Sequence, residues 1–149
     1  MRQLTANILM AAILAVMVPV PARAHEPDEV VSLNKQVVHL YDQGKYAEAT
    51  AIAQQALTLA ERVLGKEHPN TLKSVANLAL LYQDQGRYGE AEALYMRAVE
   101  ANERVLGKEH PNTLKSVANL AALYQDQGRY GEAEALYKRV VEASERVLG

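Results

Sequence analysis

The sequence predicts an all-α solenoid of three stacked helix pairs that follows a short N-terminal signal. A block of 42 residues occurs twice almost unchanged, at 66–107 and 108–149, and a diverged copy lies upstream. Within each block, apolar residues recur at the spacing of a helix face. A fixed period of this length is typical of solenoids, because one helix pair buries its apolar face only by stacking on the next.

The first 24 residues predict a cleavable signal peptide. Arg2 supplies an early positive charge, an apolar run spans 8–20, and the small residues Ala22 and Ala24 precede His25. This order is that of a secretory signal with cleavage between Ala24 and His25. The apolar run is shorter than the ~20 residues that cross a bilayer. We therefore expect an exported protein, periplasmic or secreted, with no membrane association after cleavage.

The charge, the cysteine content and the motifs of the chain exclude several classes of function. The formal net charge is −2, and acidic and basic residues are interleaved along the chain. No basic stripe indicates nucleic-acid binding. The chain contains no cysteine, which excludes disulfides, thiol nucleophiles and zinc–thiolate sites. No catalytic triad, phosphate loop or dinucleotide fingerprint is present, so we expect no enzymatic activity and no cofactor.

Residues 25–29 are predicted to be a short linker, and 30–149 to form the array, with repeats at about 24–65, 66–107 and 108–149. In the second repeat, Pro69 suits a first helical turn, and a helix is predicted over 71–85. Gly86 ends this helix because glycine enters the left-handed conformation cheaply. The apolar stripe of this helix consists of Leu72, Val75, Leu78, Ala79 and Tyr82.

A second helix is predicted over 88–106, ending at Gly107. Its stripe consists of Tyr88, Ala91, Leu94, Tyr95, Ala98, Ala101, Asn102 and Val105. We expect the small residues Ala79 and Ala91 to lie where the two helices approach closely. Glu100 and Arg104 are spaced for an ion pair along one helix face. The third repeat carries the same elements, and the first has Val37, Leu40 and Ala53 where the second has Ala79, Tyr82 and Tyr95.

The stretch NLALLYQDQGRYGEAEALYMRAVEANERVLGKEHPNT resembles the 42-residue tetratricopeptide repeat of the kinesin light chain type. The positions that carry the resemblance are Tyr82, Gly86, Tyr88, Ala91, Tyr95, Ala98 and the LG…HP…T connector. It covers about 30–149. The resemblance implies a bacterial exported protein of non-catalytic, protein-binding character, in which the first helix of each pair lines a concave groove.

A second stripe on the first helix of each full repeat is distinct from the apolar one. It consists of Lys73, Ala76, Asn77, Leu80, Gln83 and Asp84, and again of Lys115, Ala118, Asn119, Ala122, Gln125 and Asp126. The resemblance implies that these residues face the groove, and that Asn77 and Asn119 hydrogen-bond the backbone of an extended peptide. The alternative is that the stripe is simply solvated.

His68 and His110 allow two interpretations. Each could ligate a metal with the glutamate beside it, or could sit at the start of a helix and fix the turn there. Successive repeats place them on the order of 10 Å apart, too far to share an ion bound at ~2 Å. We therefore expect the turn role and no metal site. The recurring glutamates 90, 92, 100 and 103 are expected to form a solvated, ion-paired face.

Three functions fit these predictions. The first is a non-catalytic module that binds a protein or an extended peptide of unknown identity. The second is the N-terminal binding portion of a longer repeat protein with an effector domain, for example a caspase-like protease. The third is a scaffold that self-associates end to end, because Leu136, Val140, Val141, Val147 and Leu148 leave an apolar strip along the last helix.

Overall fold

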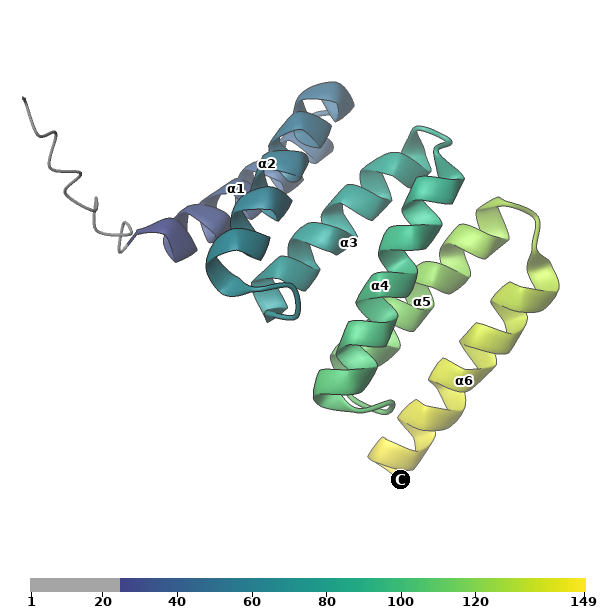
Figure 1. Ribbon diagram of the computed structural model, residues 1–149. Coiled ribbons are helices and arrows are strands. Elements are labelled where there is room, and N and C mark those ends of the chain that lie inside the picture. Colours follow the sequence, from purple (N-terminus) through teal and green to yellow (C-terminus); the bar gives the residue numbers. More distant parts are fainter. Residues whose placement is uncertain (1–24) are drawn as a thin grey trace, which may run out of the picture.

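A computed structural model describes residues 25–149, which form six α-helices and no strand (Figure 1). The helices are α1 (Glu26–Asp42), α2 (Tyr46–Leu64), α3 (Pro69–Asp84), α4 (Tyr88–Leu106), α5 (Pro111–Asp126) and α6 (Tyr130–Leu148). The all-α prediction is confirmed. The predicted signal peptide lies outside the described residues. Within 25–149, no helix is long and apolar enough to cross a bilayer.

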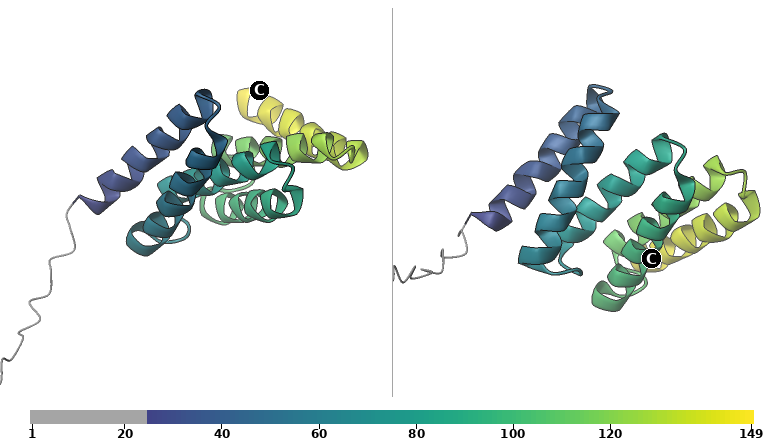
Figure 2. Two further views of the ribbon diagram at one scale, coloured as in Figure 1. Left: turned by 90° about the horizontal axis from the view of Figure 1, so that it is seen from above. Right: turned by 45° about the horizontal axis from the view of Figure 1, so that its top comes forward.

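The helices pack as three antiparallel pairs that follow one another along a curved array (Figures 1 and 2). We call α1, α3 and α5 the A helices and their partners the B helices. Each B helix also packs against the A helix of the next pair. The A helices differ at the two junctions: α1 packs against α3, whereas no comparable contact joins α3 to α5 in the described residues.

The ends of α3 follow from its sequence. Pro69 lies in the first turn, as predicted, and His68 is the N-cap. At the other end Gly86 has φ +71°, a conformation that costs glycine little. The Gly86 amide donates to the Gln83 carbonyl at 2.9 Å, and the next amide donates to the Tyr82 carbonyl at 2.8 Å. These bonds satisfy carbonyls that the helix end leaves unpaired.

The predicted linker at 25–29 is wrong, because α1 begins at Glu26. Pro27 lies in the first turn, where its missing N–H is not needed. Glu26, Asp28 and Glu29 are acidic in that turn and interact favourably with the positive end of the helix dipole. The chain therefore becomes helical within two residues of the predicted cleavage site.

The core forms where the small residues were predicted to permit close approach. Ala79 and Ala91 are fully buried at the crossing of α3 and α4. Tyr82 and Tyr95 belong to the same continuous cluster, which extends through all three pairs. In the first repeat Val37, Leu40 and Ala53 are buried in that cluster too, so their substitutions preserve the packing of α1 on α2.

Two detailed predictions are wrong. Val105, assigned to the core stripe, is 51% exposed. Arg104 does not pair with Glu100; it forms an ion pair with Glu67, before α3. Both partners are largely exposed, so the pair adds little stability.

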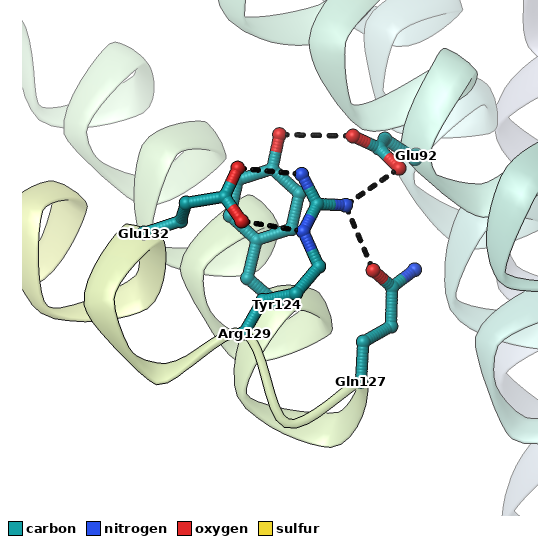
Figure 3. A network of polar contacts seen from close by, with 5 residues as sticks. All are labelled: Glu92, Tyr124, Gln127, Arg129 and Glu132. Atoms are coloured by element: carbon teal, nitrogen blue, oxygen red, sulfur yellow. Dashed lines mark hydrogen bonds and ion pairs between the residues drawn. The ribbon is translucent and has the colours of Figure 1, made fainter.

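A polar network joins the second and third pairs (Figure 3). The Tyr124 hydroxyl donates to Glu92 at 3.0 Å, and the Arg129 guanidinium lies 3.9 Å from the Tyr124 ring centroid. Arg129 also contacts Glu92 at 2.9 Å, Gln127 at 2.8 Å and both carboxylate oxygens of Glu132 at 2.7 Å. The hydrogen bond from Arg129 lowers the pKa of Glu132. One guanidinium thereby connects α4, the turn after α5, and α6.

Candidate functional site

A cavity of about 580 Å³ lies between α3 and α5, on the side of the array that the A helices form. Its lining residues are Pro69, Asn70, Leu72, Lys73, Ala76, Asn77, Leu80, Tyr95, Asn102, Leu106, Asn112, Lys115, Ser116 and Asn119. Half of the ten predicted groove residues are among them: Lys73, Asn77, Leu80, Lys115 and Asn119. We call this cavity and the A-helix stripes beside it the groove.

The N-terminal halves of α3 and α5 give one end of the groove a positive character. Lys73 and Lys115 lie one turn into their helices and are exposed. Neither helix has an acidic residue in its first turn, so the positive end of each helix dipole is not offset locally. This end of the groove therefore favours anionic groups.

Asn77 and Asn119 occupy identical positions in nearly identical repeats, yet their surroundings differ. The Asn77 amide nitrogen donates to Asn34 Oδ1 at 3.2 Å. Asn34 is 2% exposed and donates to the Asn70 carbonyl at 3.3 Å. Because a backbone carbonyl only accepts, this bond fixes Asn34 Oδ1 towards Asn77. Asn119 forms no comparable bond in the described residues, since Ala76 occupies the position that corresponds to Asn34.

The same substitution distinguishes the junction that holds this cavity from the preceding junction. Asn34 accepts a hydrogen bond from Ser74 at 3.0 Å in addition to the bonds to Asn70 and Asn77, so α1 is tied to α3. Ala76 has no polar side-chain atom, so among the described residues α3 and α5 are joined by a side-chain hydrogen bond only near their C-terminal ends, between Gln83 and Asp126. The two A helices of the full repeats therefore leave room for a ligand between them.

Other predicted groove residues take part in contacts between repeats. Gln83 is buried, and its amide donates to Asp126 at 2.6 Å. At the preceding junction Tyr41 occupies the position of Gln83, and its hydroxyl donates to Asp84. That hydrogen bond, with burial and the charge of Asp84, raises the pKa of Tyr41 to about 12. Asp84 and Asp126 thus receive donors from the preceding repeat and remain exposed to solvent.

Ala122 and Gln125 lie outside the cavity lining. Ala122 is half-buried, and Gln125 is exposed and accepts a hydrogen bond from Tyr137 at 3.5 Å. Leu80, which corresponds to Ala122, does line the cavity. The substitution of leucine by alanine at this position makes the third repeat less apolar along the groove.

His68 and His110 cap helices, in agreement with the turn interpretation. Each ring accepts a hydrogen bond at Nδ1, from the backbone N–H of Asn70 or Asn112, at 3.1 Å. This bond satisfies one of the amides that a helix start leaves free. Within residues 25–149, no group of three or more side chains is placed to hold a metal ion.

Sequence reasoning did not identify four polar residues of this region as functional. Asn34 and Ser116 were given no role, while Tyr95 and Asn102 were assigned to the core. Asn102 is buried, and its amide donates to Ser116 at 2.9 Å. A buried amide or phenol needs a hydrogen-bond partner. The polar atoms of Tyr95 and Asn102 were therefore the signal that these two core positions also line the cavity.

A family model for the tetratricopeptide repeat matches residues 28–101 and, overlapping them, 74–146. Over 40 residues the chain is 50% identical to the human clustered mitochondria protein homolog, a match that covers 27% of this chain and 3% of that protein. The array is also similar to several solved structures of helical repeat proteins.

A Podosopora anserina protein of nearly identical TPR-like repeats, named after kinesin light chain, is 31% identical with a TM-score of 0.75; the match covers 83% of this chain and 58% of that one. BtubC (BKLC) from P. vanneervenii is 22% identical with a TM-score of 0.72, over 80% of this chain and 48% of that one. The TPR domain of Arabidopsis FLU is 20% identical with a TM-score of 0.70, over 81% of this chain and 98% of that one. The chain thus spans little more than half the length of the first of these structures. Since the two matches of the repeat model together cover 28–146, the chain belongs to the tetratricopeptide repeat family.

Proposed function

We propose that the groove between α3 and α5 binds an extended segment of a protein partner. Tetratricopeptide repeats are generally modules of protein–protein interaction, and the cavity of about 580 Å³ between two A helices supports that role for this chain. The observation that carries the proposal is that one cavity is lined by Asn119, whose amide forms no side-chain hydrogen bond in the described residues, by two exposed lysines and by Leu80. Such a surface can satisfy both the backbone and the side chains of an extended segment.

The chemistry of the lining matches an extended segment better than a compact ligand. A carboxamide both donates and accepts, so it can pair with the N–H and C=O of one ligand residue. Lys73 and Lys115 supply charges for a ligand carboxylate. Leu80 and Leu106 add apolar area, which selects alternate side chains of an extended chain.

The two asparagines contribute unequally to this binding. Asn77 uses one of its two amide N–H donors on Asn34, so one N–H and its oxygen remain for the ligand. Asn119 keeps both N–H donors and its oxygen. We therefore expect replacement of Asn119 by alanine to weaken binding by about 1–2 kcal/mol, and replacement of Asn77 to weaken it less.

The test begins with selection of binders from a random library of twelve-residue peptides on the immobilised chain. A selected peptide should perturb the amide resonances of residues around Asn77 and Asn119, and Asn119→Ala should reduce its affinity about tenfold. Glu100→Gln, on the exposed side of α4, is the matched control and should bind normally. Peptides that perturb only the B helices, or that bind Asn119→Ala with full affinity, would contradict the proposal.

We further propose that this binding takes place outside the cytoplasm. The support is the charged start, apolar run and small-residue ending of residues 1–24. On this proposal the partner is a periplasmic or extracellular protein, and its segment reaches the groove after export.

A further inference from the structure

The outward face of α6 has the residues of a face that the other B helices cover with a following A helix. The helix α6 lies at one end of the array (Figure 1), and among the described helices it packs closely only against α5. The helix α4 has nearly the same sequence and packs against both α3 and α5. Comparison of the two helices, position by position, therefore identifies the side chains of α6 that a following helix would cover.

Eight residues of α6 are more exposed than their counterparts in α4. Tyr137 is 37% exposed, whereas Tyr95, at the same position of α4, is 2% exposed. The other seven are Tyr130, Glu134, Val140, Val141, Ser144, Glu145 and Leu148. Their spacing places them along one side of the helix, and we call the eight residues the α6 strip. The strip combines a large apolar area with two carboxylates.

The first carboxylate, Glu134, has a counterpart that binds a tyrosine and an arginine. Glu92 accepts a hydrogen bond from the Tyr124 hydroxyl at 3.0 Å and pairs with Arg129 at 2.9 Å (Figure 3). Tyr124 and Arg129 belong to α5 and to the turn after it, which follow α4 in the array. Within the described residues Glu134 forms no hydrogen bond and no ion pair through its side chain. A helix that covered the strip in the same way would bring both partners to it.

The second carboxylate, Glu145, has counterparts that pair with an arginine at both internal junctions. Glu61 pairs with Arg97 and Glu103 pairs with Arg139, each at 2.6 Å. Both pairs are partly buried, so they are less screened by solvent than the ion pairs of a fully exposed surface. In the described residues Glu145 has no arginine or lysine partner. Charges arranged in this way favour a partner that carries matching cations.

The first helix of a second copy of this chain is a poor match for the strip. Leu78 and Leu81 of α3, which has α2 before it, are 5% and 1% exposed. The same positions of α1 hold Gln36 and His39, which are exposed. Burial of an amide or an imidazole against apolar side chains, without a hydrogen-bond partner, costs free energy.

The first repeat also lacks the tyrosine and both arginines of these contacts. Their positions hold Leu40, Lys45 and Gln55. Leu40 has no hydroxyl to donate to Glu134, and Gln55 has no charge for Glu145. Lys45 has a charge but not the planar set of donors with which an arginine binds a carboxylate. The strip therefore matches a helix pair of the kind seen in the second and third repeats and not the first.

We propose that the α6 strip binds a helix pair of a helical repeat in another protein. The first helix of that pair carries a tyrosine near its end, an arginine follows five residues later, and a second arginine follows ten residues after the first. This is the spacing of Tyr124, Arg129 and Arg139. The tyrosine and the first arginine contact Glu134, and the second arginine contacts Glu145. The strip shares no residue with the groove, so this docking is independent of ligand binding there.

The probe is a peptide with the sequence of residues 109–129, which contains α5 and the turn after it. It is stapled between positions 115 and 119, on its groove face, so that it is helical and its remaining faces are unchanged. We expect saturable binding to the full chain at low salt, with shifts of the amide resonances of Tyr137 and Val141. The matched control is the stapled peptide of residues 25–45, the aligned segment of the first repeat, which should bind at least about tenfold more weakly.

A double-mutant cycle tests the predicted ion pair directly. Glu134→Gln in the chain and Arg129→Gln in the peptide should each weaken binding about fivefold, and the two together should weaken it no further. Val141→Lys in the chain should weaken binding about tenfold, whereas Glu100→Gln, on the exposed side of α4, should leave the affinity unchanged. Equal binding of the two peptides, additive losses in the cycle, or shifts centred on the groove would each overturn the proposal.

Discussion

Replacement of Asn34 by alanine is the most direct test of how the first repeat shapes the groove. The substitution installs the residue that the other two repeats carry at the same position, Ala76 and Ala118. It therefore introduces nothing foreign to the array. It removes three hydrogen bonds, to the Asn70 carbonyl at 3.3 Å, from Ser74 at 3.0 Å and from Asn77 at 3.2 Å.

The expected loss of stability follows from the fate of each partner. Ser74 retains a bond to the Asn70 carbonyl at 3.1 Å, and Asn77 is half-buried, so both find partners or water after the substitution. A net hydrogen bond contributes about 0.5–1.5 kcal/mol. With partial compensation, Asn34→Ala should lower the free energy of unfolding by about 1–3 kcal/mol.

Urea denaturation followed by circular dichroism at 222 nm measures this loss. The comparison variant is Asn119→Ala, which removes the counterpart of Asn77 at the junction that lacks Asn34 and should change stability by less than ~0.5 kcal/mol. A double-mutant cycle between Asn34 and Asn77 should give a coupling energy of about 0.5–1.5 kcal/mol. A coupling near zero, or equal destabilisation by Asn119→Ala, would refute the non-equivalence of the two junctions.

Four further predictions follow from other parts of the chain. His68→Ala removes the cap of α3 and should lower stability by about 1 kcal/mol, measured by urea denaturation. The raised pKa of Tyr41, to about 12, means that the folded state resists ionisation of this phenol more than the unfolded state does. Stability should therefore decline between about pH 10 and 12, and decline less steeply in Tyr41→Phe. Expressed with residues 1–24 in a bacterial host, the chain should be exported and should begin at His25, as judged by intact mass. The 149-residue chain should self-associate through α6, where Val141 is exposed, and Val141→Lys should reduce association in sedimentation experiments.

Each of these predictions has a contrary result. Equal stability of His68→Ala and the parent would show that the cap contributes nothing. An alkaline transition of the same steepness in Tyr41→Phe would assign the pH dependence to other groups. A mass that retains residues 1–24 would contradict cleavage. A monomer at ~100 μM, where exposed apolar patches commonly associate, would contradict association through α6.

The helices were predictable because local signals agreed. Pro69 and Gly86 lie at the ends of α3, and the residues assigned to its apolar stripe are buried. The errors occurred where a neighbour in space decided the outcome. Val105 has a helical apolar spacing yet is 51% exposed, and Arg104 pairs with Glu67, 37 residues away in sequence. Sequence periodicity describes one helix at a time and contains no information about where its partner ends.

The residue types along the groove were predictable from the sequence. Which of these side chains hydrogen-bond to a neighbouring repeat was not. Lys73, Asn77 and Leu80 of the predicted stripe line the cavity. Gln83 does not, and it bonds to Asp126 of the next repeat. Asn34 was not identified, although it differs from Ala76 and Ala118 at an aligned position. A polar residue that replaces alanine at one position of a repeat is a signal that the contacts at that junction differ.

The near-identity of the second and third repeats therefore conceals a difference in their surfaces. In a solenoid each internal repeat packs against two neighbouring repeats. The polar groups available to a ligand are those that form no hydrogen bond to either neighbour. Asn77 faces a first repeat that carries Asn34 and loses a donor to it, while Asn119 faces Ala76 and loses none. One substitution in the diverged repeat thus adds hydrogen bonds between α1 and α3 that have no counterpart at the same positions between α3 and α5. A binding site can arise in such an array without any change in the repeats that form its walls, because the adjoining repeat decides which of their identical side chains remain available.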